Sequence, residues 1–232
     1  MPDFTSRSTK AEYLDQPTVN KKELFLNLAE LDRINQLLGG HTATVKGVER
    51  LLEDRSKVYH LVDFACGGGD TLRHLALWSK KSGYRLKLYG FDILPEAIEY
   101  AKSNSKGYDI SYKVADFNNY SPSHQVDIAC NALVCHHFYG HTLDSFLLKM
   151  KELAEVGIVI NDLHRHPMAY QSIQVLTRFF SKSLYVKHDA PLSVLKGFSK
   201  SEWQQTLDRL GFEQYHLEWV WAFRHLIYWR KP

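Results

Sequence analysis

The segment that most constrains the fold is a short buried strand followed by three consecutive glycines. Residues 58–64 (VYHLVDF) form an apolar run that is too short for a helix, and the glycines at 67–69 follow it closely. Helical spacing of apolar residues then extends over residues 70–82. A strand, a glycine turn and a helix in this order are typical of an open α/β sheet, where such a turn brings the backbone close to a ligand. We therefore expect a binding site at the carboxyl end of this strand.

The same alternation of strands and helices continues along the chain and indicates a doubly wound α/β sheet. Further strands are predicted at residues 86–91, 110–114, 126–133, 156–160, 213–221 and 224–229, and helices at 21–38, 42–52, 95–103, 143–154, 168–180 and 199–211. The first five strands should be parallel. The last two should form an antiparallel hairpin because few residues separate them. Residues 1–16 are polar and are expected to be loosely ordered.

Composition and charge favour a single globular domain. Of the 232 residues, 44% are hydrophobic and 24% are charged, which is ordinary globular usage. The net charge of +3 is spread along the chain, which argues against nucleic acid as a partner. No apolar run approaches the roughly 20 residues of a membrane-spanning helix, and residues 1–10 lack the pattern of a secretory signal. We therefore expect a cytoplasmic protein without stable membrane insertion, whose three cysteines are reduced thiols because they form no C-x-x-C pair.

Carboxylates near the glycine loop distinguish between two classes of nucleotide-like ligand. Leu72 stands where a dinucleotide fingerprint has its third glycine, and Asp63 near the end of the strand would repel a pyrophosphate, so a nicotinamide dehydrogenase is disfavoured. A carboxylate instead suits S-adenosylmethionine, which carries a sulfonium and an ammonium group but no phosphate. Asp92 ends the next strand and follows the glycines at about the 20-residue spacing of a ribose-binding acid. Asp116 can accept a hydrogen bond from an adenine amino group, and Phe117 offers an apolar face to the ring.

In their order and spacing these residues resemble the class I S-adenosylmethionine-dependent methyltransferases. The family's pattern of an acid, a small residue and G-x-G stands here as Asp63, Ala65, Gly67 and Gly69, with Ala65 where the family more often has glycine. The resemblance extends over residues 58–232 and implies a single domain with a Rossmann-like seven-stranded sheet, covered by a helical lid at residues 1–57. The cofactor-binding residues that it implies are Asp63, Ala65, Cys66, Gly67, Gly69, Asp92, Ile93, Asp116, Phe117, Asn131 and Leu133.

The segment after the fourth predicted strand indicates the kind of methyl acceptor. It has neither the [D/N]-P-P-[Y/F] element of enzymes that methylate DNA amino groups nor the Pro-Cys nucleophile of cytosine C5 enzymes. The run His136-His137-Phe138 instead resembles the HHF of small-molecule methyltransferases related to quinone-ring enzymes. The stretches ELDRINQLLGGH, INDLHRHP and HDAPLSVLKGF are similar to a bacterial group associated with phenolic or polyketide products. The resemblance therefore implies a small-molecule acceptor with a phenolic or polyketide-like hydroxyl. The alternatives are an RNA or protein methyltransferase and a non-catalytic S-adenosylmethionine-binding module.

Two adjacent histidines are the candidate catalytic residues. With an ordinary pKa near 6.5, a histidine can take the proton of a hydroxyl as its oxygen attacks the methyl group. One of His136 and His137 would be this base and the other a structural hydrogen-bonding residue. In the alternative interpretation, both are loop histidines that close the pocket.

Other polar residues near the predicted edge carry weaker signals. Arg165 and its neighbouring histidines follow the fifth strand, where they would either contact an acidic acceptor or face solvent. The pair Asn161-Asp162 stands where metal-dependent catechol enzymes carry ligands, but no matching acid ends the strand at 126–133. We therefore predict no metal.

Overall fold

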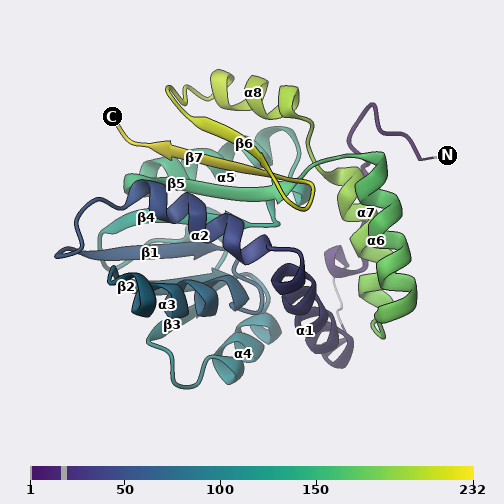
Figure 1. Cartoon of the computed structure of the whole chain (residues 1–232), viewed down its shortest axis with the longest axis horizontal. Helices are drawn as coiled ribbons and strands as arrows, with labels where there is room; N and C mark the ends of the chain where they lie inside the picture. The colour runs from purple at the N-terminus through teal and green to yellow at the C-terminus, as the bar shows by residue number, and fades with distance from the viewer. Residues whose placement is uncertain (1, 17–19) are drawn as a thin grey trace.

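A sheet lies between two layers of helices in the computed structural model, which describes residues 2–16 and 20–232 (Figure 1). Within these residues the sheet has seven strands in the order β3-β2-β1-β4-β5-β7-β6. The first five strands are parallel, and β7 pairs antiparallel with both β5 and β6. This topology confirms the predicted doubly wound sheet with its C-terminal hairpin. The strands are β1 Val58–Phe64, β2 Arg85–Asp92, β3 Ile110–Val114, β4 Val126–Ala132, β5 Ala154–Leu163, β6 His216–Val220 and β7 Arg224–Arg230.

The helices occupy most of the chain between the strands. The α-helices are α1 Lys21–Leu37, α2 Gly40–Leu51, α3 Asp70–Ser82, α4 Pro95–Asn104, α5 Gly140–Leu153, α6 Pro167–Phe180, α7 Leu184–Lys196 and α8 Lys200–Arg209. The short 3-10 helices are η1 Tyr13–Asp15, η2 Phe117–Asn119 and η3 Cys135–His137. Across the described ranges, no helix combines the length and the apolar character that crossing a membrane requires.

Two apolar cores fill the space between the sheet and its helices. On one face, Leu51 of α2, Leu72 of α3 and Ile98 of α4 pack against the strands. On the other face, Phe146 of α5 and Trp203 of α8 do so. Because both faces of the sheet are covered, the central strands β1 and β4 are buried nearly throughout and appear in the sequence as continuous apolar runs.

The strand order places a crevice at one edge of the sheet. The chain runs outward through β2 and β3 on one side of β1, and through β4 and β5 on the other. Loops that follow β1 and β4 therefore diverge at their carboxyl ends, which is where ligands bind in open α/β sheets. The glycine loop and the paired histidines lie on these two loops.

The N-terminal strap, which we define as residues 2–16, is held against the body of the protein. This differs from the loose segment that its polar composition predicts. The Arg7 guanidinium donates hydrogen bonds to the backbone oxygens of Lys196 and His136, at 2.7 and 2.8 Å. These partners lie far away in the sequence, so local composition could not reveal them.

The predicted lid at residues 1–57 forms two differently placed parts. Helix α1 lies beside α4 and α7, above the edge that carries the glycine loop, whereas α2 packs directly on β5 and β7 (Figure 1). Asp32 of α1 accepts a hydrogen bond of 2.9 Å from Arg73 of α3, which ties the two helices together. Residues 1 and 17–19 of the predicted lid lie outside the described residues. The division of the chain into a lid and a sheet within one domain stays a prediction.

Helix α7 has no counterpart among the predicted helices. Ser183 caps its first turn, because the Ser183 hydroxyl accepts a hydrogen bond from the Val186 N–H. Pro191 lies inside the helix, where the sequence pattern normally indicates a break. Tertiary packing against α6 and η1 stabilises this helix despite the proline.

Removing a buried tryptophan should test the core beneath α8. Trp203 has no exposed surface, whereas Trp219 on β6 is 52% exposed. We expect Trp203→Ala to lower the free energy of unfolding by about 3–5 kcal/mol, because it leaves a large cavity. Trp219→Ala is the matched control and should change it by less than about 0.5 kcal/mol. Urea denaturation at neutral pH measures both, and equal effects would contradict this assignment of the core.

Candidate active site

The glycine loop adopts a backbone that most residues avoid. Ala65, Gly67 and Gly69 all have a positive φ, of 54°, 50° and 69°. This explains why glycine is the more common residue at the position of Ala65 in related loops. A Cβ on Gly69 would collide with the ring of Tyr112, whereas the nearest atom to a Cβ on Gly67 would be the Leu28 side chain at 3.7 Å. The loop therefore leaves open space beside Gly67, where a ligand could approach the backbone.

Two buried carboxylates flank this loop. Asp92 accepts hydrogen bonds of 2.9 Å from the N–H groups of Gly67 and Leu94, so it fixes the loop at the end of β2. Asp63 lies near the carboxyl end of β1, close to the same loop. Its Oδ1 has no hydrogen-bond partner within the described ranges. Burial and the nearby negative charges of Asp70 and Asp92 raise the pKa of Asp63 well above its usual value. A cationic group placed next to Asp63 would relieve this cost.

The remaining residues predicted to bind cofactor are distributed around the same edge. Ile93 follows Asp92 and is 61% exposed, so it offers an apolar surface. Asp116 caps η2 by accepting hydrogen bonds from the backbone and side-chain nitrogens of Asn118. Phe117 packs on Phe146 at 5.1 Å between ring centroids. Their contacts with a cofactor stay predictions.

Two further predicted residues belong to the end of β4 and the turn after it. The Asn131 amide donates to Phe64 O at 3.3 Å, and its oxygen accepts from the Cys135 thiol. This side chain therefore braces β4 from within the protein. Leu133 has a φ of 59° and lines the cavity described below. Cys66, in the glycine loop, is a buried free thiol whose pKa burial raises well above the usual value.

His136 forms a buried pair with Asp162 at the end of β5. Its Nδ1 lies 2.8 Å from Asp162 Oδ1, and its backbone N–H donates to Oδ2 at 3.3 Å. Burial raises the pKa of Asp162, but the neighbouring His136 outweighs this effect and lowers the pKa overall. An ionised Asp162 holds the proton of the imidazole on Nδ1, which leaves Nε2 with its lone pair free.

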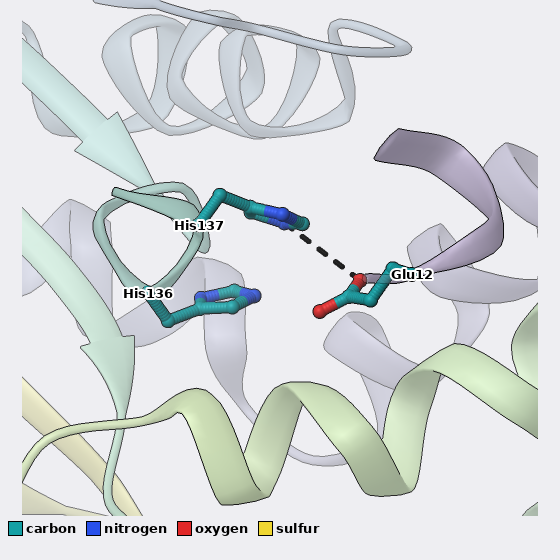
Figure 2. A group of neighbouring side chains, drawn as sticks. All are labelled: Glu12, His136 and His137. Atoms are coloured by element: carbon teal, nitrogen blue, oxygen red, sulfur yellow. Dashed lines mark ion pairs between the residues drawn. The ribbon is translucent and has the colours of Figure 1, made fainter. Parts of the chain in front are cut away.

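His137 points instead to the N-terminal strap. Its Nδ1 lies 3.1 Å from Asp15 Oδ1, and its Nε2 lies 3.9 Å from Glu12 Oε2. Figure 2 shows both imidazole rings directed from η3 toward the Glu12 carboxylate. Burial lowers the pKa of His137, but the hydrogen bond that it donates to Asp15 and the charge of Glu12 outweigh this effect and raise the pKa. The two histidines thus have separate carboxylate partners, one in the sheet and one in the strap.

A cavity of about 280 Å³ opens beside this pair. Helices α1, α6 and α7, the end of β5 and the turn between β6 and β7 enclose it, and most of its side chains are apolar. His136, His137 and Leu133 form the wall on the side of the sheet. Asn27 of α1 also lines the cavity, and its Oδ1 has no partner among the residues that the structure describes.

Two groups of side chains bring metal-ligating atoms within 4.8 Å of one another in the described part of the chain: Glu12, His136 and His137, and Asp32, His41 and His74. Each group already holds a cationic side chain. Lys196 Nζ lies 3.2 Å from Glu12 Oε1, and Arg73 Nη2 lies 2.9 Å from Asp32 Oδ2. A divalent ion at either place would face this positive charge. The absence of a metal stays our prediction.

Arg165 has a different role from either of the two that the sequence suggested. It is buried, its guanidinium bonds to both carboxylate oxygens of Glu202, at 2.8 and 2.9 Å, and it donates to Gly197 O at 2.6 Å. It therefore anchors the start of α8, and it is not among the residues that line the cavity described above.

Sequence reasoning missed the partner of His136 and a second buried arginine. Asp162 follows the predicted strand at 156–160, at the same edge as the histidines, but from the sequence we considered it only as a metal ligand. Arg224 lines the cavity from the start of β7. No local motif surrounds it, because only the antiparallel pairing of β7 with β5 brings it there.

The raised pKa of His137 makes its contribution to stability depend on pH. A histidine whose pKa rises on folding contributes fully below its unfolded value of about 6.5 and loses this contribution as the pH rises through the folded value. The free-energy difference between the wild type and His137→Gln should therefore shrink between about pH 6 and pH 9. Urea unfolding across this range measures it. In an Asp15→Asn background the trend should be largely lost, and a difference independent of pH would contradict the assignment.

Comparison with known proteins agrees with this geometry. Residues 61–157 match a family model described as "Methyltransferase domain". A search of curated protein sequences finds no match to this chain.

Several solved structures with similar folds are methyltransferases. Human N-acetylserotonin methyltransferase in complex with S-adenosylmethionine is 18% identical with a TM-score of 0.63, over 92% of this chain and 57% of that one. Plantazolicin methyltransferase BpumL in complex with S-adenosylhomocysteine is 16% identical with a TM-score of 0.65, over 91% of this chain and 96% of that one. An S-adenosylmethionine-dependent methyltransferase from Aquifex aeolicus is 19% identical with a TM-score of 0.62, over 92% and 99%. This chain thus spans little more than half of the human enzyme.

The segment that matches the family model contains the glycine loop, both flanking carboxylates and the paired histidines. The resemblance inferred from the order of these residues is confirmed. Residues 61–157 therefore match a methyltransferase domain, and the fold of the chain is that of solved S-adenosylmethionine-dependent methyltransferases.

Proposed function

We propose that this chain transfers a methyl group from S-adenosylmethionine to a hydroxyl of a small, largely apolar acceptor of the phenolic or polyketide type. The observation that carries the proposal is that His136, which lines the cavity, is paired with the buried carboxylate of Asp162 behind it. The cavity lies next to the glycine loop, because Asn27 and Leu31 of α1 line it while Leu28 of the same helix reaches Gly67.

The residues at the glycine loop fit the cofactor. The open space beside Gly67 allows close approach to the backbone, and the unpartnered Oδ1 of Asp63 suits a cationic ligand. Asp92 has lone pairs left for ribose hydroxyls after it accepts two backbone hydrogen bonds. When bound, the cofactor supplies a methyl carbon that its sulfonium activates for in-line displacement.

His136 is placed to take the proton of the acceptor. With Nδ1 held by Asp162, the free Nε2 can accept the hydroxyl proton as the acceptor oxygen attacks. Asp162 then stabilises the imidazolium through the same hydrogen bond. The hydrogen bond of His137 to Asp15 attaches the strap, so we assign it to positioning rather than to proton transfer.

The shape of the cavity supports a small acceptor over a polymer. Its volume of about 280 Å³ and its mostly apolar lining suit one compact molecule. The strap, α1, α6 and α7 enclose it, so the same elements would exclude water during transfer. An RNA or a folded protein would need a more open approach.

Substitutions at the histidines test this mechanism. At saturating acceptor, His136→Ala should lower kcat by about 10²–10⁴-fold, because the base is lost. Asp162→Asn should lower it in the same direction, because Asn no longer holds the reactive tautomer. His137→Ala is the control and should have a much smaller effect. Formation of S-adenosylhomocysteine over a panel of phenols and hydroxylated polyketides measures the rate.

Two outcomes would reject parts of this proposal. Unchanged turnover in His136→Ala would reject the general base, whatever the result for His137→Ala. Binding of S-adenosylhomocysteine without turnover of any small acceptor would favour the non-catalytic module instead.

A glycine substitution tests the cofactor site separately. Gly67→Val should abolish detectable binding of S-adenosylhomocysteine in isothermal titration, because valine fills the space beside the loop and disfavours a positive φ. Gly107→Val imposes a similar backbone strain at an exposed turn, where no atom lies within 4 Å of a Cβ, and should leave affinity unchanged. Retained affinity in a folded Gly67→Val protein would refute the assignment of the loop.

A further inference from the structure

Arg224 is a buried cation with unused hydrogen-bond donors. Only 3% of the residue is exposed. Its Nη2 donates to Asn35 Oδ1 at 2.8 Å, whereas Nε and Nη1 have no partner among the described residues. Buried polar atoms are rarely left without partners, so this arrangement indicates a missing hydrogen-bond acceptor.

A second buried arginine in the same protein shows how such a side chain is normally satisfied. The Arg165 guanidinium bonds to the Glu202 carboxylate and to backbone oxygens through its Nε, Nη1 and Nη2 atoms. Arg224 is equally buried but bonds only to a neutral amide. Unlike Arg165, it has no carboxylate partner within the described chain.

Among residues 2–16 and 20–232, the surroundings of Arg224 contain no free counter-ion. The carboxylates of Asp162 and Asp70 are near enough to favour its charge, but burial dominates and lowers the pKa of Arg224 to about 10. The guanidinium is thus still protonated at neutral pH. Asp162 is engaged by His136, and Asp70 lies 3.5 Å from His41. Neither carboxylate forms a hydrogen bond with Arg224.

Arg224 also lines the cavity assigned to the acceptor. It lies there with Asn35 and Leu38 of the α1 end, with Leu133, and with Trp221 of the turn before β7. The His136 imidazole belongs to the same wall. An anionic group bound to Arg224 would therefore lie in the same cavity as the proposed base.

We propose that Arg224 is a carboxylate-binding residue that anchors one end of a ligand in this cavity. This inference rests on the proposed function and sharpens it. The carboxylate belongs either to the acceptor, which is then a hydroxy acid, or to the methionine end of the cofactor. Both offer the same chemistry, because a carboxylate accepts charged hydrogen bonds from a guanidinium.

Paired ligands that differ only in a carboxylate distinguish the two sources. The first pair is S-adenosylhomocysteine and its decarboxylated analogue, S-adenosyl-3-thiopropylamine. The second is 3-hydroxybenzoate and its methyl ester, each titrated with S-adenosylhomocysteine saturating. Isothermal titration compares the wild type with Arg224→Met, which keeps the length but not the charge, and Arg224→Lys, which keeps the charge but not the planar fork. Arg178→Met, at an exposed arginine on α6, is the control.

We expect the wild type to bind the carboxylate member of one pair at least ten-fold more tightly than its neutral counterpart. Arg224→Met should abolish this preference, and Arg224→Lys should retain part of it. A preference confined to the first pair assigns the site to the cofactor, and one confined to the second assigns it to the acceptor. Arg178→Met should match the wild type.

The inference is overturned if, for both pairs, the ratio of the affinity for the carboxylate ligand to that for its neutral counterpart is the same in the wild type and in Arg224→Met. A wild type that shows no preference in either pair is one such result. The midpoint of thermal unfolding distinguishes a structural role from a binding role. If Arg224 is purely structural, its replacement by methionine lowers this midpoint and leaves the affinity ratios unchanged. If Arg224→Met does not fold, unchanged ratios in Arg224→Lys also reject the proposal. Binding is measured without turnover, so failure here leaves the test of His136 intact.

Discussion

The carboxyl ends of four parallel strands meet at one edge of the sheet, and the candidate site depends on this alignment. Parallel pairing of β1 with β2 and β4, and of β4 with β5, brings Asp63, Asp92, the histidine turn and Asp162 to the same edge. Helices on both faces bury the strands, so the side chains at their ends are held rigidly. A rigid sheet is what allows a base and a cofactor loop on different strands to keep a fixed separation.

Buried charges at this edge are arranged in matched groups. Asp162 pairs with His136, and Asp15 lies between His137 and Lys196. Burial raises the pKa of Asp15, but its bonds to His137 and Lys196 outweigh this effect and lower it. These ion pairs join the strap, which covers one side of the cavity, to η3 and α7. Arg224, on which our further inference rests, has no such partner within the described chain, and neither has Asp63.

Local sequence patterns predicted the strands well, because short apolar runs bounded by turn residues mark them along the chain. Residues 58–64 and 110–114 form strands with the predicted bounds, and the glycine turn follows β1 as its spacing indicates. The observed β5 is longer than the predicted run at 156–160, because pairing with β7 extends it to Leu163. Helix α7 was missed because Pro191 is a local breaker that tertiary contacts override. The strap was mispredicted because each of its anchors is a long-range ion pair or hydrogen bond.

The sequence by itself determined the fold class and the kind of cofactor loop, because the apolar periodicity, the three glycines and the order of Asp63, Asp92 and Asp116 are all readable along the chain. It also identified the pair of histidines, but not which of the two rings is hydrogen-bonded to the carboxylate at the end of β5. Only the tertiary structure decided that Asp162 orients His136, and only it placed Arg224 without a counter-ion in the cavity. The physical reason is that burial and ion pairing depend on which distant segments meet, and strand register sets this rather than local sequence.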